Sequence, residues 1–414
     1  MKLLLIIFVF AGSIIAQDLR LKSFIEEALQ NNQALKSAEK KTLANSQLPD
    51  QVSALPDPVF GVTQWLQPVE TRVGPQQNIF SLSQKIPFPG KLDLKEKIAR
   101  QPGEISRLNF EIARRDLVFS IKTGWYDLYL SDRSLIILDD YLLLLKDFIN
   151  AAQAKYATGQ GIQAQIIKAQ VEQTSINVRI HDLKRKRSTT LARLNATRNK
   201  SADSDIGKVT IIDSSYNRYS QNDLIEHALK NRREIKSIQL NLETADFQQD
   251  LANKNRWPDL TIKANYITVL DKNTPAVDAG EDAWGIMFGF NIPLWQAPRN
   301  AAIEQSRQLA LMEHAKLADL KIRIKNEIAD LVFREKSTLE TLKLYKHELL
   351  PQAENSLNSA FSAYRSGNFS FLDLLDAERM LLQLRLSFVR EQANHKKIVA
   401  ALERAVGTEM IVDN

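Results

Sequence analysis

Residues 364–378 read Y-R-S-G-N-F-S-F-L-D-L-L-D-A-E, from Tyr364 to Glu378. A related stretch, Y-A-T-G-Q-G-I-Q-A-Q-I-I-K-A-Q, runs from Tyr156 to Gln170. In each stretch a glycine follows a long helical pattern, as expected just past a helix C-terminus where the backbone needs a positive φ. Ser370, with Asp373 three residues later, is typical of an N-cap and capping box. The two stretches therefore predict the bends of two helical hairpins.

Short motifs recur along the chain in the same order, which indicates an internal repeat. Their offset grows slowly from 200 to 208, as chance matches would not do. We therefore predict three parts: a signal peptide at residues 1–16, a first structural repeat at 17–205 and a second at 206–414. The matching motifs are Ala28-Leu29 with Ala228-Leu229, Pro56-Asp57 with Pro258-Asp259, Ile86-Pro87 with Ile292-Pro293, and Tyr156 with Tyr364. The predicted bends lie at 158–161 in the first repeat and 366–369 in the second.

The first 16 residues have the pattern of a secretory signal peptide. Lys2 precedes the apolar run Leu3–Phe10, and small residues follow up to Ala16. This apolar core is short for a bilayer-spanning helix, and a cleavage site before Gln17 fits the pattern. We therefore expect an exported chain.

Apolar residues in the long helical stretches recur at alternating spacings of three and four, as in coiled-coil seams. Such seams precede and follow each predicted bend, so we expect long antiparallel helices. Ordinary helix packing would give the same residues a core role. The seams include Leu135, Leu138, Leu142, Leu145 and Ile149; Ile166, Ala169, Ile176 and Ile180; Leu317, Leu320, Ile324, Ile328 and Leu331; and Leu381, Leu384 and Phe388.

Four short stretches between the helices alternate apolar residues with polar or small ones. They lie at about 58–67, 78–86, 259–270 and 283–293. Segments of this length with one apolar side fit the strands of a transmembrane barrel. Tryptophans in or beside them would form an interfacial belt, namely Trp65, Trp257, Trp284 and Trp295. A soluble four-stranded sheet with a buried aromatic face is the alternative interpretation at this point.

The lengths of the helical stretches favour the transmembrane interpretation. The runs from Lys91 to Gly159 and from Pro298 to Gly367 each hold about 68 residues, or roughly 100 Å of helix. The shorter helices of each repeat, stacked end to end, match one long helix. Open sheet edges are not tolerated in lipid, and four strands cannot enclose a lumen. We therefore expect an oligomer.

The composition excludes several classes of function. The 414 residues include no cysteine, so disulfides, thiol catalysis and cysteine zinc sites are excluded. The five histidines form no helical metal motif. The 55 basic and 49 acidic residues are mixed along the chain, which indicates a solvated surface and no nucleic-acid partner. With no nucleophile–base pair or phosphate loop in the sequence, we predict no enzyme activity and no catalytic, cofactor-binding or metal-binding residue.

These features resemble the TolC family of outer membrane efflux ducts over essentially the whole mature chain. The most specific are the doubled Tyr-x-x-Gly bend, the Leu375–Glu378 run L-D-A-E, and Gln84–Lys91, which reads Q-K-I-P-F-P-G-K. The last is similar to the heavy-metal cation efflux branch, the CusC/CzcC-like proteins.

The resemblance implies a mainly α fold with a small β part. Three chains would form an α-helical barrel in the periplasm. Their four strands each would build a shared twelve-stranded transmembrane β-barrel in the outer membrane of a Gram-negative bacterium. The implied partners are two further copies of the chain, a periplasmic adaptor (membrane fusion) protein, an inner-membrane efflux pump and outer membrane lipid. The duct would passively export heavy-metal cations, or drugs and other small molecules.

The resemblance also implies two sets of site residues. Asp373 and Asp376 would form the pore constriction, although Asp373 is also explained as part of a helix cap. The adaptor would dock on a tip made by the bends: Thr158, Gly159, Gln160, Ser366, Gly367 and Asn368.

The main alternative function is a soluble periplasmic coiled-coil adaptor or scaffold, which would leave the tryptophan-bearing strands unexplained. Three local features are expected to interrupt the regular pattern. Pro102-Gly103 should break the first long helix and Pro351 should kink the second. Val209–Ile212 is a possible strand in the polar segment between the repeats.

Overall fold

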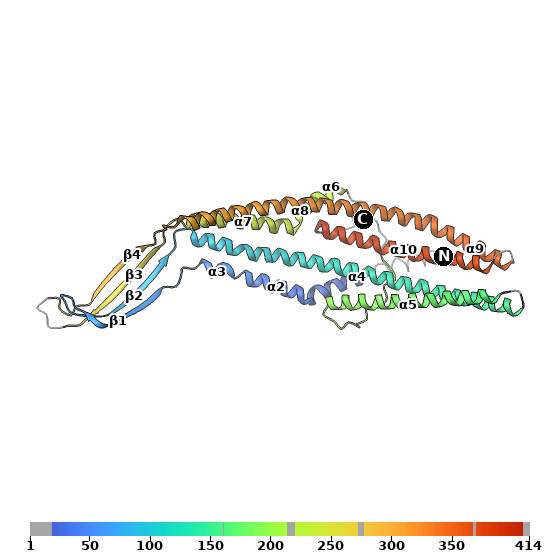
Figure 1. The fold of residues 1–414 in the computed structure, drawn as a ribbon, viewed down its shortest axis with the longest axis horizontal. Coiled ribbons are helices and arrows are strands. Elements are labelled where there is room, and N and C mark those ends of the chain that lie inside the picture. The colour runs from blue at the N-terminus through green and yellow to red at the C-terminus, as the bar shows by residue number, and fades with distance from the viewer. Residues whose placement is uncertain (1–18, 160, 213–219, 272–276, 367–369, 409–414) are drawn as a thin grey trace, which may run out of the picture. The chain divides into compact units, whose positions relative to one another are not determined.

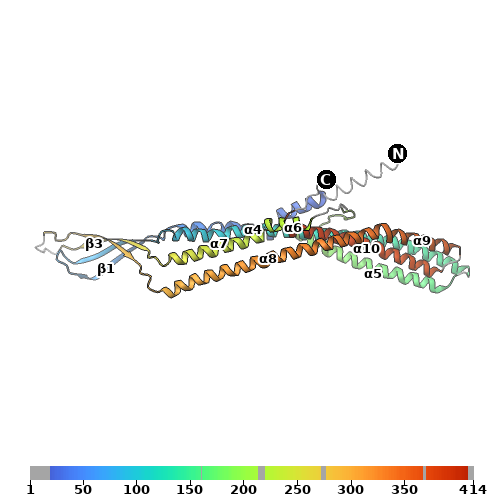
Figure 2. The same cartoon turned by 90° about the horizontal axis from the view of Figure 1, so that it is seen from above.

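The structure is a computed structural model that describes residues 19–159, 161–212, 220–271, 277–366 and 370–408. The expected signal peptide lies outside the described residues, as do Gln160, Gly367 and Asn368. The chain divides into two compact units. Residues 1–37, 111–232 and 321–414 form the first, here called the bend unit, and residues 38–110 and 233–320 form the second, here called the sheet unit. The long helices α4 (Lys91–Ala157) and α8 (Gln296–Leu344) have residues in both units (Figures 1 and 2).

The sheet unit contains one antiparallel sheet of four strands in the order β1-β2-β3-β4 (Figure 1). The strands are β1 (Val59–Val69), β2 (Gln76–Ile86), β3 (Leu260–Val269) and β4 (Ala283–Phe290). The prediction of four strands is therefore confirmed. In the described part of the chain, β1 and β4 each have one edge with no neighbouring strand.

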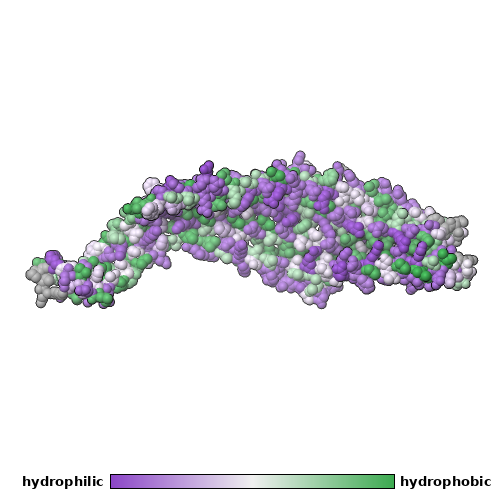
Figure 3. Space-filling view, viewed as in Figure 1, coloured by the Kyte–Doolittle hydropathy of each residue, from purple (hydrophilic) through white to green (hydrophobic). Residues whose placement is uncertain are grey.

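Apolar side chains predominate in two central rows on one face of this sheet, and the central row of the other face holds small and polar residues. The register places Phe60, Leu82, Ala264 and Ile286 in one cross-strand row and Val62, Phe80, Tyr266 and Trp284 in the next row on that face. The opposite face carries the row Gly61, Ser81, Asn265 and Gly285. The apolar face is not covered: Trp284 is 78% exposed and Phe60 is 65% exposed. Figure 3 shows hydrophobic residues at the surface over the strands.

Helices continue from the ends of the strands in the sheet unit. They are α3 (Leu48–Ser53), most of α2 (Gln33–Asn45), α7 (Arg233–Lys254) and the first parts of α4 and α8. The expected break at Pro102-Gly103 is wrong, because α4 continues through both residues. The Asn45 side chain donates hydrogen bonds to Ser106 Oγ at 2.6 Å and to the Pro102 carbonyl at 3.4 Å. A Cβ at position 103 would meet the Asn45 carbonyl at 3.5 Å, an ordinary van der Waals contact, so the packing of α2 on α4 does not itself require a glycine there.

The bend unit is built from helix pairs whose apolar seams meet in a common core. The pairs are the second part of α4 with α5 (Gln163–Thr197), and α9 (Leu350–Arg365) with α10 (Phe371–Val406) (Figures 1 and 2). The most buried members of this core are Leu138 and Leu145 of α4, Ile176 of α5, and Phe371 and Leu374 of α10. The α4 and α5 members include residues of the predicted seams, so the 3–4 repeat identified a true core. A second cluster surrounds Trp125 and includes Phe24 and Leu194.

The expected irregularity near Pro351 takes the form of a π-helical segment. Residues Tyr345–Leu349 form one π-helical turn between α8 and α9. Pro351 has no N–H to give to the preceding turn, and its ring crowds the carbonyl there. Widening that turn is a common way to accommodate such a residue.

The segment after α5 is not a strand at 209–212, so that expectation is wrong. The N–H of Val209 donates to Asp132 Oδ2 at 2.8 Å, and Arg187 Nε donates to Asp132 Oδ1 at 2.6 Å. The Asp132 side chain is only 1% exposed. One buried carboxylate therefore fixes this segment against α4 and α5 in place of a β ladder.

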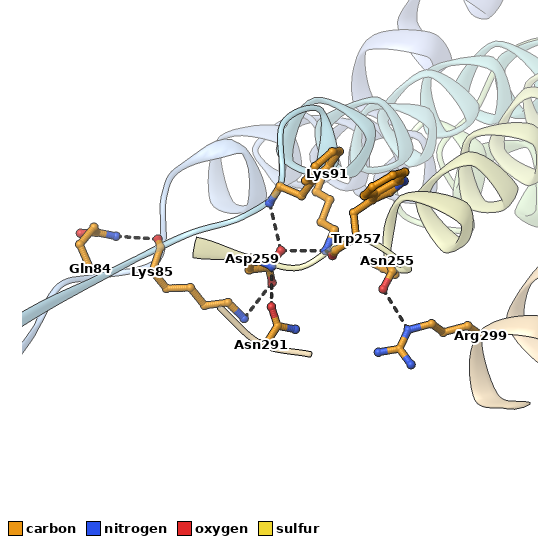
Figure 4. A network of polar contacts seen from close by, with 9 residues as sticks. Gln84, Lys85, Lys91, Asn255, Trp257, Asp259, Asn291 and Arg299 are labelled. Carbon is orange, nitrogen blue, oxygen red and sulfur yellow. Dashed lines mark hydrogen bonds and ion pairs between the residues drawn. The ribbon is translucent and has the colours of Figure 1, made fainter. Parts of the chain in front are cut away.

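A polar network joins strands to helices in the sheet unit and centres on Asp259, just before β3 (Figure 4). Lys91 Nζ donates to Asp259 Oδ1 at 2.7 Å, and the Phe88 N–H donates to the same oxygen at 3.0 Å. Lys85 Nζ lies 3.1 Å from Asp259 Oδ2. Asn291 accepts from the Asp259 N–H. The network links the ends of β2, β3 and β4 to the first residue of α4.

This network explains the Gln84–Lys91 motif in physical terms. Pro87 and Pro89 have no N–H for a ladder, and Gly90 takes a φ of +84°, so the strand ends and α4 starts at Lys91. Trp257 stacks on Phe88 with ring centroids 5.4 Å apart, and its carbonyl accepts from Lys91 Nζ at 2.9 Å. The motif thus ends strand β2, starts helix α4 and supplies Lys91, the lysine that pairs with Asp259.

Asp259 is charged over the whole physiological range. Burial by itself would raise the pKa of its carboxyl group, but the hydrogen bonds from Lys91, Phe88 and Lys85 outweigh burial and lower the pKa to about 2. Because the folded-state pKa is depressed, the stabilisation is complete above about pH 4 and is lost as the pH falls towards 2.

We predict that Asp259→Asn lowers the free energy of unfolding by about 3 kcal/mol at pH 7, because Lys91 would stay buried without its counter-ion. Thermal and denaturant unfolding of the purified protein would measure this, and the difference should shrink as the pH falls from about 4 towards 2. Asp57→Asn is the matched control, because Asp57 holds the repeat-related position and is exposed. Equal stability of wild type and Asp259→Asn at pH 7 would contradict the role of the network.

Candidate functional site

The candidate site lies in the bend unit, where the helix pairs turn. Helix α4 ends at Ala157 and α5 begins at Gln163. Gly159 takes a φ of +73°, and a Cβ there would meet nothing within 4 Å. The glycine is therefore needed for the turn and faces open space, and Thr158 beside it is exposed. At the second bend α9 ends at Arg365. The N–H of the C-cap residue Ser366 donates a hydrogen bond to the Ser362 carbonyl.

Helix α10 starts with the capping box expected from the sequence. The Asp373 N–H donates to Ser370 Oγ at 3.2 Å, and the Ser370 hydroxyl donates to Asp373 Oδ2 at 2.7 Å. Asp373 also lies in the first turn of α10, where the helix dipole favours a carboxylate. The capping role predicted for Asp373 is therefore confirmed, and its carboxylate is also exposed.

Asp376 lies one turn further along α10, three residues after Asp373, and so shares its exposed side of the helix. Its carboxylate is 70% exposed and pairs with Arg379 at 3.1 Å. Arg379 also pairs with Glu172 of α5 at 2.6 Å, across the two helix pairs. The structure thus adds Arg379 and Glu172 to the two predicted aspartates.

A buried carboxyl group lies on the opposite side of this turn and was missed from the sequence. Glu378 is only 6% exposed, and burial raises its pKa to about 7 against a weaker opposing effect of Arg385. The phenol of Tyr141 in α4 is also buried, and its hydroxyl makes no hydrogen bond in the described part of the chain. Burial, with the nearby charges of Glu172 and Glu378, raises the pKa of Tyr141.

The sequence held a signal for Glu378. The buried residues Phe371, Leu374, Leu381 and Leu382 of α10 place position 378 on the same apolar stripe. A glutamate at a core position of a 3–4 repeat is a marked exception to the pattern.

A groove of about 480 Å³ lies beside the bends, between α4, α9 and α10. Four of its eight lining residues are aromatic, and Lys155 Nζ lies above the Tyr364 ring at 3.9 Å from the centroid. The apolar lining includes Leu144, Phe148, Phe361, Tyr364 and Phe371. The bend unit therefore offers an apolar groove next to the exposed turn at Thr158 and Gly159.

The described residues hold no cluster of histidine, aspartate and glutamate side chains arranged to bind a metal ion. In the same part of the chain no helix is both long enough and apolar enough to cross a bilayer. Charged side chains and an apolar groove therefore lie around the helix ends at the bends.

Residues 224–408 match the sequence family described as "Outer membrane efflux protein". A cobalt-zinc-cadmium resistance protein, CzcC of Cupriavidus metallidurans, is 19% identical over 348 residues, covering 82% of this chain and 79% of that protein.

Solved structures of outer membrane proteins share the fold. VceC of Vibrio cholerae has a TM-score of 0.78 at 20% identity, covering 94% of this chain and 97% of that one. CusC, whose crystal structures concern folding and transmembrane channel formation, has a TM-score of 0.77 at 17% identity. The match covers 94% of this chain and 92% of the CusC chain. The chain therefore has the fold of these channel proteins along nearly all of its length.

We predict that Glu378→Gln stabilises the protein at pH 8 by on the order of 2 kcal/mol. Because the folded-state pKa is raised, the wild type must ionise a buried carboxyl group above pH 7, which the glutamine avoids. The gain should disappear as the pH falls from about 7 to 4.5, where the wild-type side chain is neutral. Unfolding midpoints at pH 5 and pH 8 would measure this.

The control for that experiment is Glu340→Gln, an exposed glutamate of α8 in the same unit. Its unfolding midpoint should follow the wild type at both pH values. A Glu378→Gln variant that does the same would contradict the burial argument.

Proposed function

We propose that this chain, which carries an outer membrane efflux protein domain of the TolC type, is the outer membrane duct of a tripartite efflux system. The observation that carries the proposal is the sheet: its apolar face is exposed and both of its edges are unpaired in the described chain. A soluble protein would cover such a face, whereas lipid satisfies it. The alternative of a soluble periplasmic adaptor or scaffold leaves this face without an explanation.

We propose three copies per duct. Backbone N–H and C=O groups at a sheet edge need partners inside a bilayer, so the edges of β1 and β4 must be covered by other copies. Three four-stranded sheets would give a closed barrel of twelve strands, wide enough for a lumen. The apolar face would contact lipid, and the face with Gly61, Ser81, Asn265 and Gly285 would line the lumen. The helices would continue the passage through the periplasm.

We propose that Asp373 and Asp376 narrow the passage at the bend end. In a trimer they would form a ring of six carboxylates, which attracts cations. Arg379 neutralises part of this charge through its pairs with Asp376 and Glu172. Each chain would thus contribute three carboxylates and one guanidinium group to the mouth. Passage of heavy-metal cations, or of drugs and other small molecules, would depend on this charge and on its protonation.

We propose that the bends dock the periplasmic adaptor, which links the duct to an inner-membrane pump. Support comes from the exposed turn at Thr158 and Gly159 and from the apolar groove beside it. Apolar grooves of this kind bind amphipathic helices. Gln160, Ser366, Gly367 and Asn368 complete the proposed tip.

We predict that Asp373→Asn together with Asp376→Asn raises single-channel conductance in planar bilayers and lowers cation selectivity, because the negative charge at the mouth is removed. The reversal potential in a salt gradient would measure selectivity. Ser370→Ala is the matched control, since it removes the cap hydrogen bond without a charge, destabilising α10 by about 1 kcal/mol. An unchanged reversal potential in the double variant would exclude these aspartates from the constriction.

We predict that Gly367→Lys abolishes export while assembly is retained, because a bulky cation at the tip would block adaptor docking. Export of a substrate of the system, and capture of the adaptor by the purified duct, would be measured in parallel. Thr174→Lys adds the same charge on an exposed position of α5 away from the turn and should leave both unchanged. Normal export by Gly367→Lys would rule out docking at this position.

A further inference from the structure

Another cavity of the bend unit lies between α4, α5 and α10. Its volume is about 640 Å³, within the range of sites that hold small organic molecules. All of its lining residues belong to the bend unit, so one chain holds the whole cavity. Each of the three helices contributes leucine to the lining: Leu130 and Leu138 from α4, Leu183 from α5 and Leu386 from α10. The cavity therefore has an apolar surface against which a ligand would bury a ring or a short chain.

The charged side chains of this lining are mostly basic. Four basic side chains and two carboxylates line the cavity. Both carboxylates already have basic partners. Asp182 pairs with Arg185 at 2.9 Å. Asp127 pairs with Lys397 and, at 3.4 Å, with Arg193, neither of which lines the cavity. The negative charges are thus neutralised, and the cavity keeps an excess of positive charge.

Two arginines of the lining carry this excess, Arg179 of α5 and Arg390 of α10. Among the residues that the structure describes, neither guanidinium group makes a hydrogen bond or an ion pair. Both side chains are exposed to solvent, and they reach the cavity from different helices. A guanidinium group donates several N–H bonds in a fixed plane, which matches the oxygens of a carboxylate, sulfonate or phosphate. The two arginines therefore favour an anionic ligand.

A buried hydroxyl group in the same lining points to the same kind of ligand. Ser134 of α4 is only 5% exposed, and its hydroxyl makes no hydrogen bond to any residue that the structure describes. One turn earlier, Ser131 donates to the Asp127 carbonyl at 2.9 Å, so the two serines differ. Buried hydroxyl groups nearly always have a partner. An oxygen atom of a bound ligand would supply the partner that Ser134 lacks.

We propose that this cavity binds a small organic anion with an apolar body, such as an aryl sulfonate or an aryl carboxylate. The anionic group would bind the guanidinium groups of Arg179 and Arg390 and accept a hydrogen bond from Ser134. The apolar body would lie against the leucines. The ligand is opposite in charge to the cations that the proposed constriction attracts, so the site goes beyond the proposed function.

Fluorine NMR of a small aryl sulfonate tests the ligand class on the intact purified protein in a non-ionic detergent. The probe is para-(trifluoromethyl)benzenesulfonate, and a ligand of its size should bind with a dissociation constant of about 0.1–1 mM. The uncharged para-(trifluoromethyl)benzyl alcohol has the same apolar body and should bind at least about tenfold more weakly, because it cannot neutralise the arginines. Micelles without protein give the background for both probes. Equal affinity for the two probes would overturn the proposal.

Variants of the lining test which residues hold the anion. Arg179→Gln with Arg390→Gln should weaken sulfonate binding at least about tenfold, because both free guanidinium groups are removed. Ser134→Ala should weaken it about threefold, since one neutral hydrogen bond is lost. Arg114→Gln with Lys168→Gln is the matched control: it removes two exposed positive charges of the same unit outside the cavity and should bind as the wild type does. Wild-type affinity in the double arginine variant, or an equal loss in the control, would overturn the site.

Chemical protection locates the site in the unaltered chain. Phenylglyoxal modifies accessible arginines, and mass spectrometry of peptides measures the rate at each one. Saturating sulfonate should slow the modification of Arg179 and Arg390 at least about threefold and leave Arg114 unchanged. Equal rates with and without the probe would overturn the site. Because one chain holds the whole cavity, a failure of the proposed function would leave these results unchanged.

Discussion

The structure depends on one constraint: a four-stranded sheet with an uncovered apolar face and two open edges. In water such a sheet would associate without order, and in lipid its edge N–H and C=O groups would lack partners. Both problems are solved when copies of the chain close the sheet into a barrel. We infer that the trimer, its lumen and its insertion into the outer membrane follow from this closure, and that the helices would extend the passage.

The junction around Asp259 shows how short motifs far apart in the sequence set this arrangement. A carboxylate before β3 holds a lysine at the start of α4 and a second lysine at the end of β2. Two prolines and a glycine with positive φ stop the strand and start the helix. The same few residues thus end strand β2 and begin the long helix α4.

The sequence predicted the elements well where a regular pattern existed. Alternation identified the four strands, and the 3–4 repeat identified core residues such as Leu138 and Ile176. The prediction failed where a contact with a residue that is distant in the sequence determines the local structure. Pro102 lies inside helix α4, where its carbonyl accepts a hydrogen bond from Asn45 of α2, and the segment at Val209 is fixed by the buried Asp132. At the candidate site, Asp373 and Asp376 were predicted, whereas the Arg379–Glu172 pair was not, because it joins two helices that are distant in the sequence. Glu378 lies at an apolar position of the α10 repeat and was recognisable from the sequence.

The central claim is that this chain works as a closed oligomer in the outer membrane, and the most direct test is the mass of the particle extracted by mild detergent from the outer membrane fraction. Light scattering coupled to size exclusion, corrected for bound detergent, would give that mass. We expect three copies of the chain in one particle. A single chain recovered from the soluble periplasm would contradict it, and the apolar face of the sheet would then need a cover from elsewhere.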